Sequence, residues 1–368
     1  MVILFLSIVC GFYLIAISVL IYGFTKIKDY TNSGLLPKTG FTIIVPFRDE
    51  AENLPNLLDS FSKLNYPSNL FRVILVDDAS KDDFKISDFE FQVSIINNNR
   101  SSKSPKKDAI VTAMNLVTTD WVITTDADCR VHKNWLLTLD NYIQGHEVAM
   151  IAGAVTYSCD TTFLHQFQQL DIASLQGATI GSFGINNGFM CNGANLAYTK
   201  SLFQELNGFE GNDTIASGDD VFLLQKAIAR APEKVHYLKS KSSIVTTKPL
   251  EDWRSLFQQR VRWASKTASY QSSFGKTLAI VVFMGNVCWL FTFAYFLLEN
   301  SNTLTVLLLL FLKIIIDMVL ILKSNQFLNS KRTSYLLVSS IFYPFFSVSV
   351  ALYSLLGKYE WKGREFTS

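Results

Sequence analysis

Four long apolar segments constrain this chain more than any other feature, because they predict a protein built into a membrane. The segments with few or no charged residues are 1–25, 278–298, 303–322 and 334–357. Each is about as long as a helix that crosses a ~30 Å hydrocarbon core. We therefore expect a retained N-terminal anchor at residues 1–25 and a C-terminal membrane region at residues 277–357.

Basic residues beside these segments predict their orientation. Lys26 and Lys28 follow the first segment directly, which by the positive-inside rule places its C-terminal end in the cytoplasm. Three more basic residues separate the third and fourth segments, namely Lys323, Lys331 and Arg332. The sequence thus predicts a multi-pass protein of the cell (inner) membrane, with a cytoplasmic domain at about residues 38–250.

The fourth segment has two possible paths. It could cross the membrane fully, or Pro344 could break it into two re-entrant half-helices. The tail at residues 358–368 is basic, which favours its return to the cytoplasm and hence the re-entrant path.

Lys313 and Asp317 lie four residues apart within the third apolar segment. On a helix they would share one face and form an ion pair, because an isolated charge in lipid is costly. The pair either faces neighbouring helices as a structural contact or handles substrate.

Hydrophobic residues make up 49% of the chain, which is high for a soluble protein. Between the first and second membrane segments, however, the sequence alternates apolar strands with helical patterns. Such alternation predicts an α/β domain with a mostly parallel sheet. The predicted strands are 41–45, closed by Pro46, then 71–76, 91–96, 121–125 and 148–155. The predicted helices are 49–63, 105–116, 133–144, 163–175, a run that begins near 219, and 250–268. Residues 180–193 are rich in Gly and Asn and predict a flexible loop.

Polar residues follow three of the predicted strands. Ligands bind beyond the carboxyl ends of strands in such sheets, so these residues are expected to share one crevice. The residues concerned are Pro46, Glu50, Asp77, Asp78, Asp126 and Asp128. Asp126 and Asp128 would face the same side of an extended strand end, where carboxylate oxygens suit Mg²⁺ or Mn²⁺. Alternatively, the two acids simply open a turn.

Further candidates lie on predicted helices. Lys106 could balance diphosphate charge, or belong to a solvated basic patch. Asp219 and Asp220 begin a helix, where one acid caps the helix dipole and the other could act as a general base. Gln259, Arg262 and Trp263 share one helix face that suits a diphosphate and a sugar ring, or a membrane interface at residues 250–272.

Cysteine and histidine patterns exclude other classes of site. The chain has five cysteines and four histidines, and their spacing fits neither a zinc site nor a disulfide framework.

Seven short motifs occur in a fixed order. They are IVPFRDE (44–50), VDDAS (76–80), KKDAI (106–110), TDAD (125–128), SGDD (217–220), QRVRW (259–263) and WKGR (361–364). In this order they resemble the motifs of the inverting family 2 glycosyltransferases with a GT-A fold, particularly membrane-bound synthases and ceramide-glucosyltransferase-like enzymes. Ala79 and Pro105 stand where the family pattern has Gly, which reduces backbone freedom at one position and removes an amide at the other.

The resemblance implies transfer of a sugar from a UDP- or GDP-sugar to an acceptor hydroxyl, with Mg²⁺ or Mn²⁺ as cofactor. It places Pro46, Glu50, Asp77 and Asp78 near the nucleotide, with Lys106 at the diphosphate, and Asp126 and Asp128 at the metal. It makes Asp220 the base, and puts Asp219, Gln259, Arg262 and Trp263 on the diphosphate and acceptor side.

The membrane segments favour a lipid acceptor, and no nucleic-acid partner is expected. Two other readings remain. One is a processive polysaccharide synthase, and the other is a membrane-anchored binding protein with a decayed transferase fold.

Overall fold

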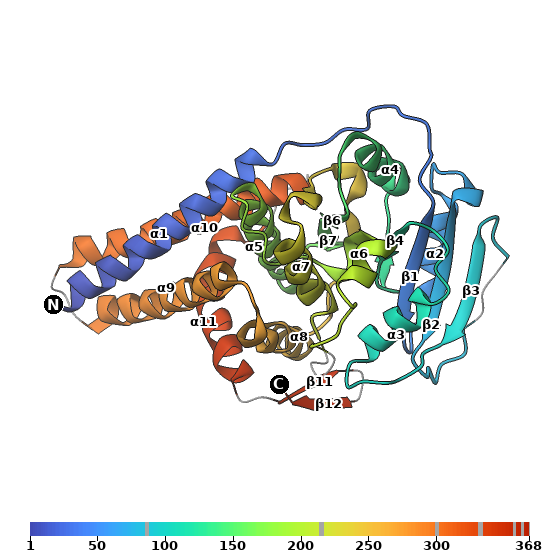
Figure 1. Ribbon diagram of the computed structural model, residues 1–368. Coiled ribbons are helices and arrows are strands. Elements are labelled where there is room, and N and C mark those ends of the chain that lie inside the picture. Colours follow the sequence, from blue (N-terminus) through green and yellow to red (C-terminus); the bar gives the residue numbers. More distant parts are fainter. Residues whose placement is uncertain are drawn as a thin grey trace. The chain divides into compact units, whose positions relative to one another are not determined.

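A computed structural model of the chain describes residues 1–84, 88–212, 217–298, 302–329, 334–355, 358–361 and 364–367; for residue 268 and the last two ranges it describes the backbone alone. These residues form two compact units. The first contains Met1–Ile27, Cys159–Phe189 and Pro249–Ser368, and the second contains Lys28–Ser158 and Met190–Lys248. We describe each unit by itself, with the element labels of Figure 1.

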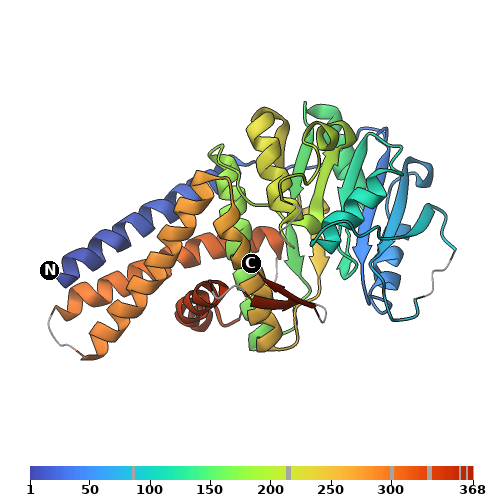
Figure 2. The same cartoon turned by 60° about the horizontal axis from the view of Figure 1, so that its bottom comes forward.

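The second unit is built on a seven-stranded sheet with the order β3-β2-β1-β4-β8-β6-β9 (Figure 2). β8 runs antiparallel to β4 and β6, whereas the other neighbouring pairs are parallel. The expected α/β domain with a mostly parallel sheet is therefore confirmed. The strands are β1 (Phe41–Phe47), β2 (Phe71–Asp77), β3 (Gln92–Asn97), β4 (Trp121–Thr124), β6 (Met150–Gly153), β8 (Leu196–Thr199) and β9 (Val235–Leu238).

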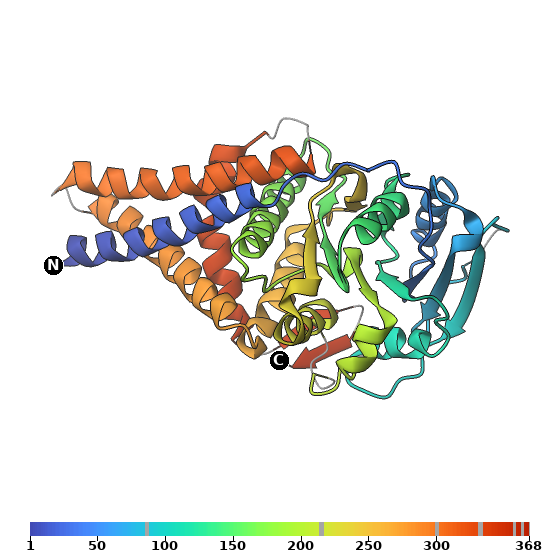
Figure 3. The ribbon, with the colours of Figure 1, turned by 45° about the horizontal axis from the view of Figure 1, so that its top comes forward.

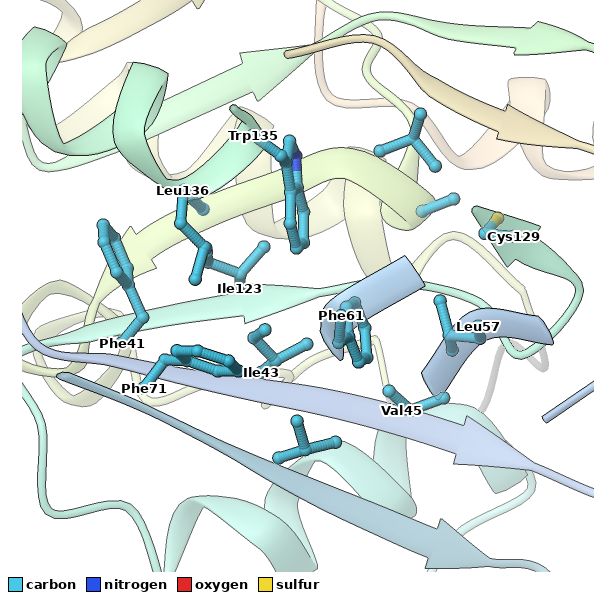
Figure 4. Close-up of a cluster of buried hydrophobic side chains, with 14 of the residues drawn as sticks. Phe41, Ile43, Val45, Leu57, Phe61, Phe71, Ile123, Cys129, Trp135 and Leu136 are labelled. Atoms are coloured by element: carbon cyan, nitrogen blue, oxygen red, sulfur yellow. The ribbon is translucent and has the colours of Figure 1, made fainter. Parts of the chain in front are cut away.

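Successive residues of a strand point to opposite faces of the sheet. Apolar side chains lie on both faces here, so helices cover the sheet. The α-helices of the unit are α2 (Leu54–Ser62), α3 (Pro105–Met114), α4 (Trp135–Gly145), α6 (Lys200–Glu205) and α7 (Asp219–Arg230). One face of β1, β2 and β4 packs against α2 and α4 in a single buried cluster. Figure 4 shows its centre, where the rings of Phe61 and Trp135 stack with centroids 6.2 Å apart.

Two strands differ from the sequence-based expectation. β1 continues through Pro46 to Phe47, because β4 pairs only with Phe41–Ile44 and Pro46 has β2 alone as its partner. A proline is tolerated where one side of a strand lacks a ladder partner. The strand expected at 148–155 is divided, since β7 (Val155–Tyr157) leaves the main sheet. It joins a small sheet with β5 (Cys129–Arg130) and β10 (Val245–Thr247), in the order β5-β10-β7.

The first unit is mainly helical, with α1 (Val2–Lys26), α5 (Phe163–Gly184), α8 (Trp253–Ser265), α9 (Ser273–Leu298), α10 (Thr303–Leu328) and α11 (Leu336–Ser354). Within the described residues, four helices are long and apolar enough to cross a membrane, namely α1, α9, α10 and α11. α1, α9 and α10 lie side by side (Figure 3). A two-stranded ladder of β11 (Lys358–Trp361) and β12 (Arg364–Thr367) ends the chain.

α5 corrects the prediction of a flexible loop from Ile180. The helix runs on to Gly184, because its glycines allow a close approach to α1. A Cβ atom added to Gly184 would lie 1.8 Å from the carbonyl oxygen of Gly23, and one added to Gly181 would lie 2.4 Å from that of Leu20. Small residues let helix backbones meet in this way. The glycines therefore serve helix packing here and do not indicate mobility.

α11 is one continuous helix with Pro344 inside it. The expected break into two half-helices is therefore not seen. The orientation markers Lys331, Arg332 and Lys362 lie outside the described residues, as does Gly363 of the WKGR motif.

Lys313 and Asp317 form the expected ion pair, with 2.8 Å between their charged atoms. Lys313 Nζ also donates to Asn286 Oδ1 on α9 at 2.8 Å, and Tyr13 on α1 donates to Asp317 Oδ1 at 2.6 Å. The pair therefore joins three helices, which fits its structural interpretation.

Candidate functional site

The loops that follow β1 and β2 are tied together. Lys81 N donates to Asp49 Oδ1 at 2.7 Å, and Asp49 N donates to Ser80 Oγ at 3.0 Å. Asp49 and Ala79 both adopt left-handed backbone conformations, with φ of 53° and 59°. Ala79 thus occupies a conformation that favours glycine, which matches its departure from the family pattern.

Asp77 and Asp78 have different surroundings. Asp77 Oδ1 accepts hydrogen bonds from the amide and hydroxyl of Ser80 at 2.9 and 2.5 Å, so this side chain holds the turn after β2. Asp78 is buried and accepts from Asn98 Nδ2 at 2.8 Å and from Arg100 at 3.4 Å. The carboxylate of Asp78 therefore belongs to a buried polar cluster, whereas that of Asp77 belongs to a local turn.

Pro46 and Glu50 also lie at this edge of the sheet. Pro46 is opposite Val76, one residue before the end of β2. Glu50 Oε2 accepts from Asn53 Nδ2 at 2.6 Å, just before α2 begins.

Asp126 and Asp128 lie in a turn and not on an extended strand. The expectation that they face one side of a strand end is therefore wrong. β4 ends at Thr124, and Cys129 N donates to Asp126 O at 3.1 Å to close the turn. Burial, then Asp126 and then Glu50 raise the pKa of Asp128 to about 6, and a hydrogen bond from Thr247 Oγ1 acts in the opposite direction. The turn therefore concentrates negative charge.

This donor set fits a hard divalent cation. Carboxylate oxygens are the ligands that Mg²⁺ and Mn²⁺ prefer. The pKa of Asp128 is raised first by burial and then by repulsion from Asp126 and Glu50, and a bound cation would relieve that repulsion. Among the described residues, no group of three or more His, Cys, Asp and Glu side chains is arranged to hold a metal. Mg²⁺ is commonly bound by one or two carboxylates together with water and substrate phosphates.

Lys106 joins the two acidic motifs. It is the second residue of α3, after Pro105, whose missing amide would have no partner within the helix. Its ammonium lies 2.7 Å from Asp126 Oδ1 and 3.5 Å from Asp219 Oδ2. Burial lowers the pKa of Lys106, but Asp126 and Asp219 outweigh that effect and raise it above its usual value. Lys106 is thus a cation held between two carboxylates.

Asp219 and Asp220 are the first two residues of α7, where the helix dipole favours anions. The preceding Gly218 has a φ of 83°. Asp220 Oδ2 accepts from the amide of Gly193 at 2.9 Å, and its Oδ1 accepts from the amide of Val221 at 2.7 Å. These two bonds fix the orientation of the carboxylate.

Sequence reasoning missed Gly193, Thr247 and Tyr198. A Cβ atom at Gly193 would lie 3.1 Å from Asp219 Oδ2 and 3.2 Å from Lys106 Nζ, so the backbone itself lines this cluster. The buried Tyr198 hydroxyl has no hydrogen-bond partner among the described residues. Gly193 lay in a segment interpreted as a loop, and Thr247 and Tyr198 carry no local sequence signal.

Gln259, Arg262 and Trp263 belong to α8, in the first unit. The structure therefore gathers Glu50, Lys106, the paired acids of the turn and the acids of α7 within one unit, and describes the α8 residues within the other. In α8, the side chains of Gln259 and Trp263 both contact Arg260.

Comparison with known proteins finds a family model that matches part of the chain. This model, described as "Glycosyl transferase family 2", matches residues 42–206. The matched segment contains the strands from β1 to β8, except for the first residue of β1. A curated relative, glycosyltransferase AglE from Haloferax volcanii, is 24% identical over 124 residues. That match spans 32% of this chain and 40% of the relative's length.

A solved structure shows the same fold. The mannosyltransferase PcManGT from Pyrobaculum calidifontis, in complex with GDP-Man and Mn²⁺, superposes with a TM-score of 0.57 at 15% sequence identity. The similarity covers 90% of this chain and 99% of that one. The chain thus has a GT-A-like α/β fold with a mostly parallel sheet, accompanied by apolar helices.

Proposed function

We propose that this protein transfers a sugar from a nucleoside-diphosphate sugar to a hydroxyl of a membrane lipid, with inversion at the anomeric carbon. One observation carries the proposal. Lys106 and Asp126 lie in the segment that matches the glycosyltransferase family 2 model, and Lys106 bridges Asp126 of the acidic turn to Asp219 at the start of α7. This arrangement brings diphosphate-binding chemistry next to a candidate base.

The donor would bind at the carboxyl ends of β1, β2 and β4. Asp78, with Asp77, Pro46 and Glu50 nearby, would contact the nucleoside. Asp126 and Asp128 would hold Mg²⁺ or Mn²⁺, which when bound neutralises diphosphate charge. Lys106 would add a further positive charge beside the departing diphosphate, whose negative charge grows as the glycosidic bond breaks.

Asp220 would act as the general base. Its carboxylate, oriented by the amides of Gly193 and Val221, would take the proton of the acceptor hydroxyl as the oxygen attacks the anomeric carbon. The new bond forms opposite the breaking one, so the configuration inverts and the nucleoside diphosphate leaves. Asp219 would stay paired with Lys106 and hold it beside the diphosphate.

The acceptor assignment follows from the membrane helices and the α8 motif. The helices α1, α9, α10 and α11 are long enough to cross a bilayer, which suits an acceptor that resides in the membrane. Arg262 would contact the diphosphate, and Gln259 and Trp263 would line the acceptor side, as the resemblance of this motif to membrane-bound glycosyltransferases implies. We place the protein in the cell (inner) membrane, with its α/β domain in the cytoplasm.

A labelled-donor screen tests the proposal. Purified full-length protein in native lipid extract is incubated with Mn²⁺ or Mg²⁺ and a panel of radiolabelled UDP- and GDP-sugars, with GDP-mannose among them. Label that moves into the organic phase with one donor supports a lipid glycosyltransferase and names its sugar. Label in a large polymer in the aqueous phase would instead indicate a processive polysaccharide synthase. No transfer and no metal-dependent donor hydrolysis would overturn the enzyme assignment.

A further inference from the structure

We propose that Arg260, anchored by Asp171, is a positioning residue that fixes the side chains of Gln259 and Trp263 for the transfer reaction. The inference rests on the proposed function, in which these two side chains line the acceptor side. It adds two residues to the motif. Arg260 lies between the motif positions in the sequence, and its partner Asp171 lies on a different helix, α5.

The contacts of Arg260 carry this inference. Its Nε donates to Asp171 Oδ2 at 2.5 Å, and both side chains are buried, with 5% and 4% of their surfaces exposed. The same guanidinium donates through Nη1 to Gln259 Oε1, and its central carbon lies 4.2 Å from the centroid of the Trp263 ring. One buried cation therefore contacts the amide and the indole of the motif.

A plain connection between α5 and α8 would not need this chemistry. A buried ion pair adds little net stability over well-packed apolar residues, because both charges must leave water. What the guanidinium adds is a planar group that donates in several fixed directions and stacks on an aromatic face. Asp171 fixes the plane of this group, and the plane in turn fixes Gln259 and Trp263.

The stacking has a directional consequence for Trp263. The guanidinium covers one face of the indole, so an acceptor or sugar ring can stack only on the opposite face. Likewise, Gln259 Oε1 accepts a hydrogen bond from Arg260, so the amide nitrogen of Gln259 is the atom that can donate to the acceptor. Arg260 thus determines which face and which polar atom the motif can present.

Two substitutions and a matched control test the role. Arg260→Lys keeps a positive charge for Asp171 but loses the planar stack, and Asp171→Asn keeps an acceptor of the same shape. Gln169→Leu is the control, because Gln169 also lies buried on α5 and its Nε2 donates to Asn325 Oδ1 on α10 at 2.9 Å. It removes the buried polar contact between α5 and α10.

The kinetic expectation separates positioning from stability. Both test variants should lower kcat about ten- to a hundredfold with little change in the KM for the donor, since small misplacements of reacting groups are costly. Gln169→Leu should lower the thermal unfolding temperature and retain kcat. If Arg260→Lys keeps the wild-type kcat, or if the control loses as much activity as the test variants, the inference is wrong.

A fluorescence measurement gives a readout that does not depend on activity. The emission of Trp263 is obtained as the difference between proteins with and without Trp263→Phe, since the chain has six tryptophans. In the Arg260→Lys background this emission should shift and be quenched more readily by acrylamide. An unchanged Trp263 signal would overturn the positioning role even if the wild-type protein transferred no sugar, whereas failure of transfer alone would overturn only the proposed function.

Discussion

Lys106 Nζ lies 2.7 Å from Asp126 Oδ1, so the ammonium of α3 occupies one side of the carboxylate pair expected to bind metal. Lys106→Met should therefore have two opposite effects. Turnover should fall at least about tenfold, equivalent to ~1.4 kcal/mol, because the diphosphate loses a cation. Binding of Mn²⁺ to the donor-free protein should tighten, because a competing cation is gone.

Isothermal titration with Mn²⁺ alone, alongside transfer kinetics, checks both effects of Lys106→Met. Lys63→Met is the control, since Lys63 lies directly after α2 and pairs with Asp59 at an exposed position. Weaker Mn²⁺ binding in Lys106→Met would show that the lysine assists the metal and does not compete with it.

Asp220→Asn should lower kcat about 10²–10⁴-fold, because removal of a general base typically has an effect of this size. Donor binding should persist, since the proposed metal and diphosphate contacts come from Asp126, Asp128 and Lys106, whereas Asp220 accepts hydrogen bonds from the amides of Gly193 and Val221. Single-turnover kinetics and donor titration measure the two properties separately. A variant that retains most of its turnover would remove Asp220 from the role of base.

Gly193→Ala should disturb the cluster without unfolding the domain. The new Cβ would lie 3.1 Å from Asp219 Oδ2 and 3.2 Å from Lys106 Nζ, closer than most Cβ contacts, so the ion pair must shift. We expect turnover to fall about tenfold, in line with the cost of small misplacements. Gly145→Ala, where nothing lies within 4 Å of the added Cβ, should retain the wild-type rate in the same assay.

The architecture of the α/β domain could be predicted from the sequence because its evidence is local. Alternating apolar runs and helical spacing predicted the parallel strands around β1, and the strand ends predicted that Asp78 and Asp126 lie near one edge. The geometry of the acidic turn could not be predicted in this way, since one hydrogen bond from Cys129 to Asp126 decides where the strand stops.

Long-range packing accounts for most of the remaining errors. Taken alone, Gly181 and Gly184 predict a loop. In the structure they lie in a helix and pack against the backbone of α1 at Leu20 and Gly23. Thr247 is a similar case, because it reaches Asp128 from a strand more than a hundred residues away in the chain. Pairings of this kind leave no periodic signal in either partner.

Ala79→Gly should raise the free energy of unfolding by about 0.5–1 kcal/mol. Ala79 has a φ of 59°, which costs an L-residue with a Cβ atom about 1–2 kcal/mol, and glycine removes most of that cost. Thermal unfolding in detergent measures the change. Ala51→Gly, in the neighbouring loop and without a positive φ, should instead lower stability slightly. Equal shifts in both variants would argue against strain at Ala79.

Gly184→Ala should destabilise the helical unit, because the added methyl group would lie 1.8 Å from the carbonyl oxygen of Gly23 and α1 would have to move away from α5. Overpacking of this kind typically costs about 1–3 kcal/mol. Gly11→Ala on α1 meets nothing within 4 Å and should be neutral or slightly stabilising. Thermal unfolding of the two variants in the same detergent compares them directly. If Gly184→Ala unfolds at the wild-type temperature, the close approach of α1 and α5 at these glycines does not contribute to stability.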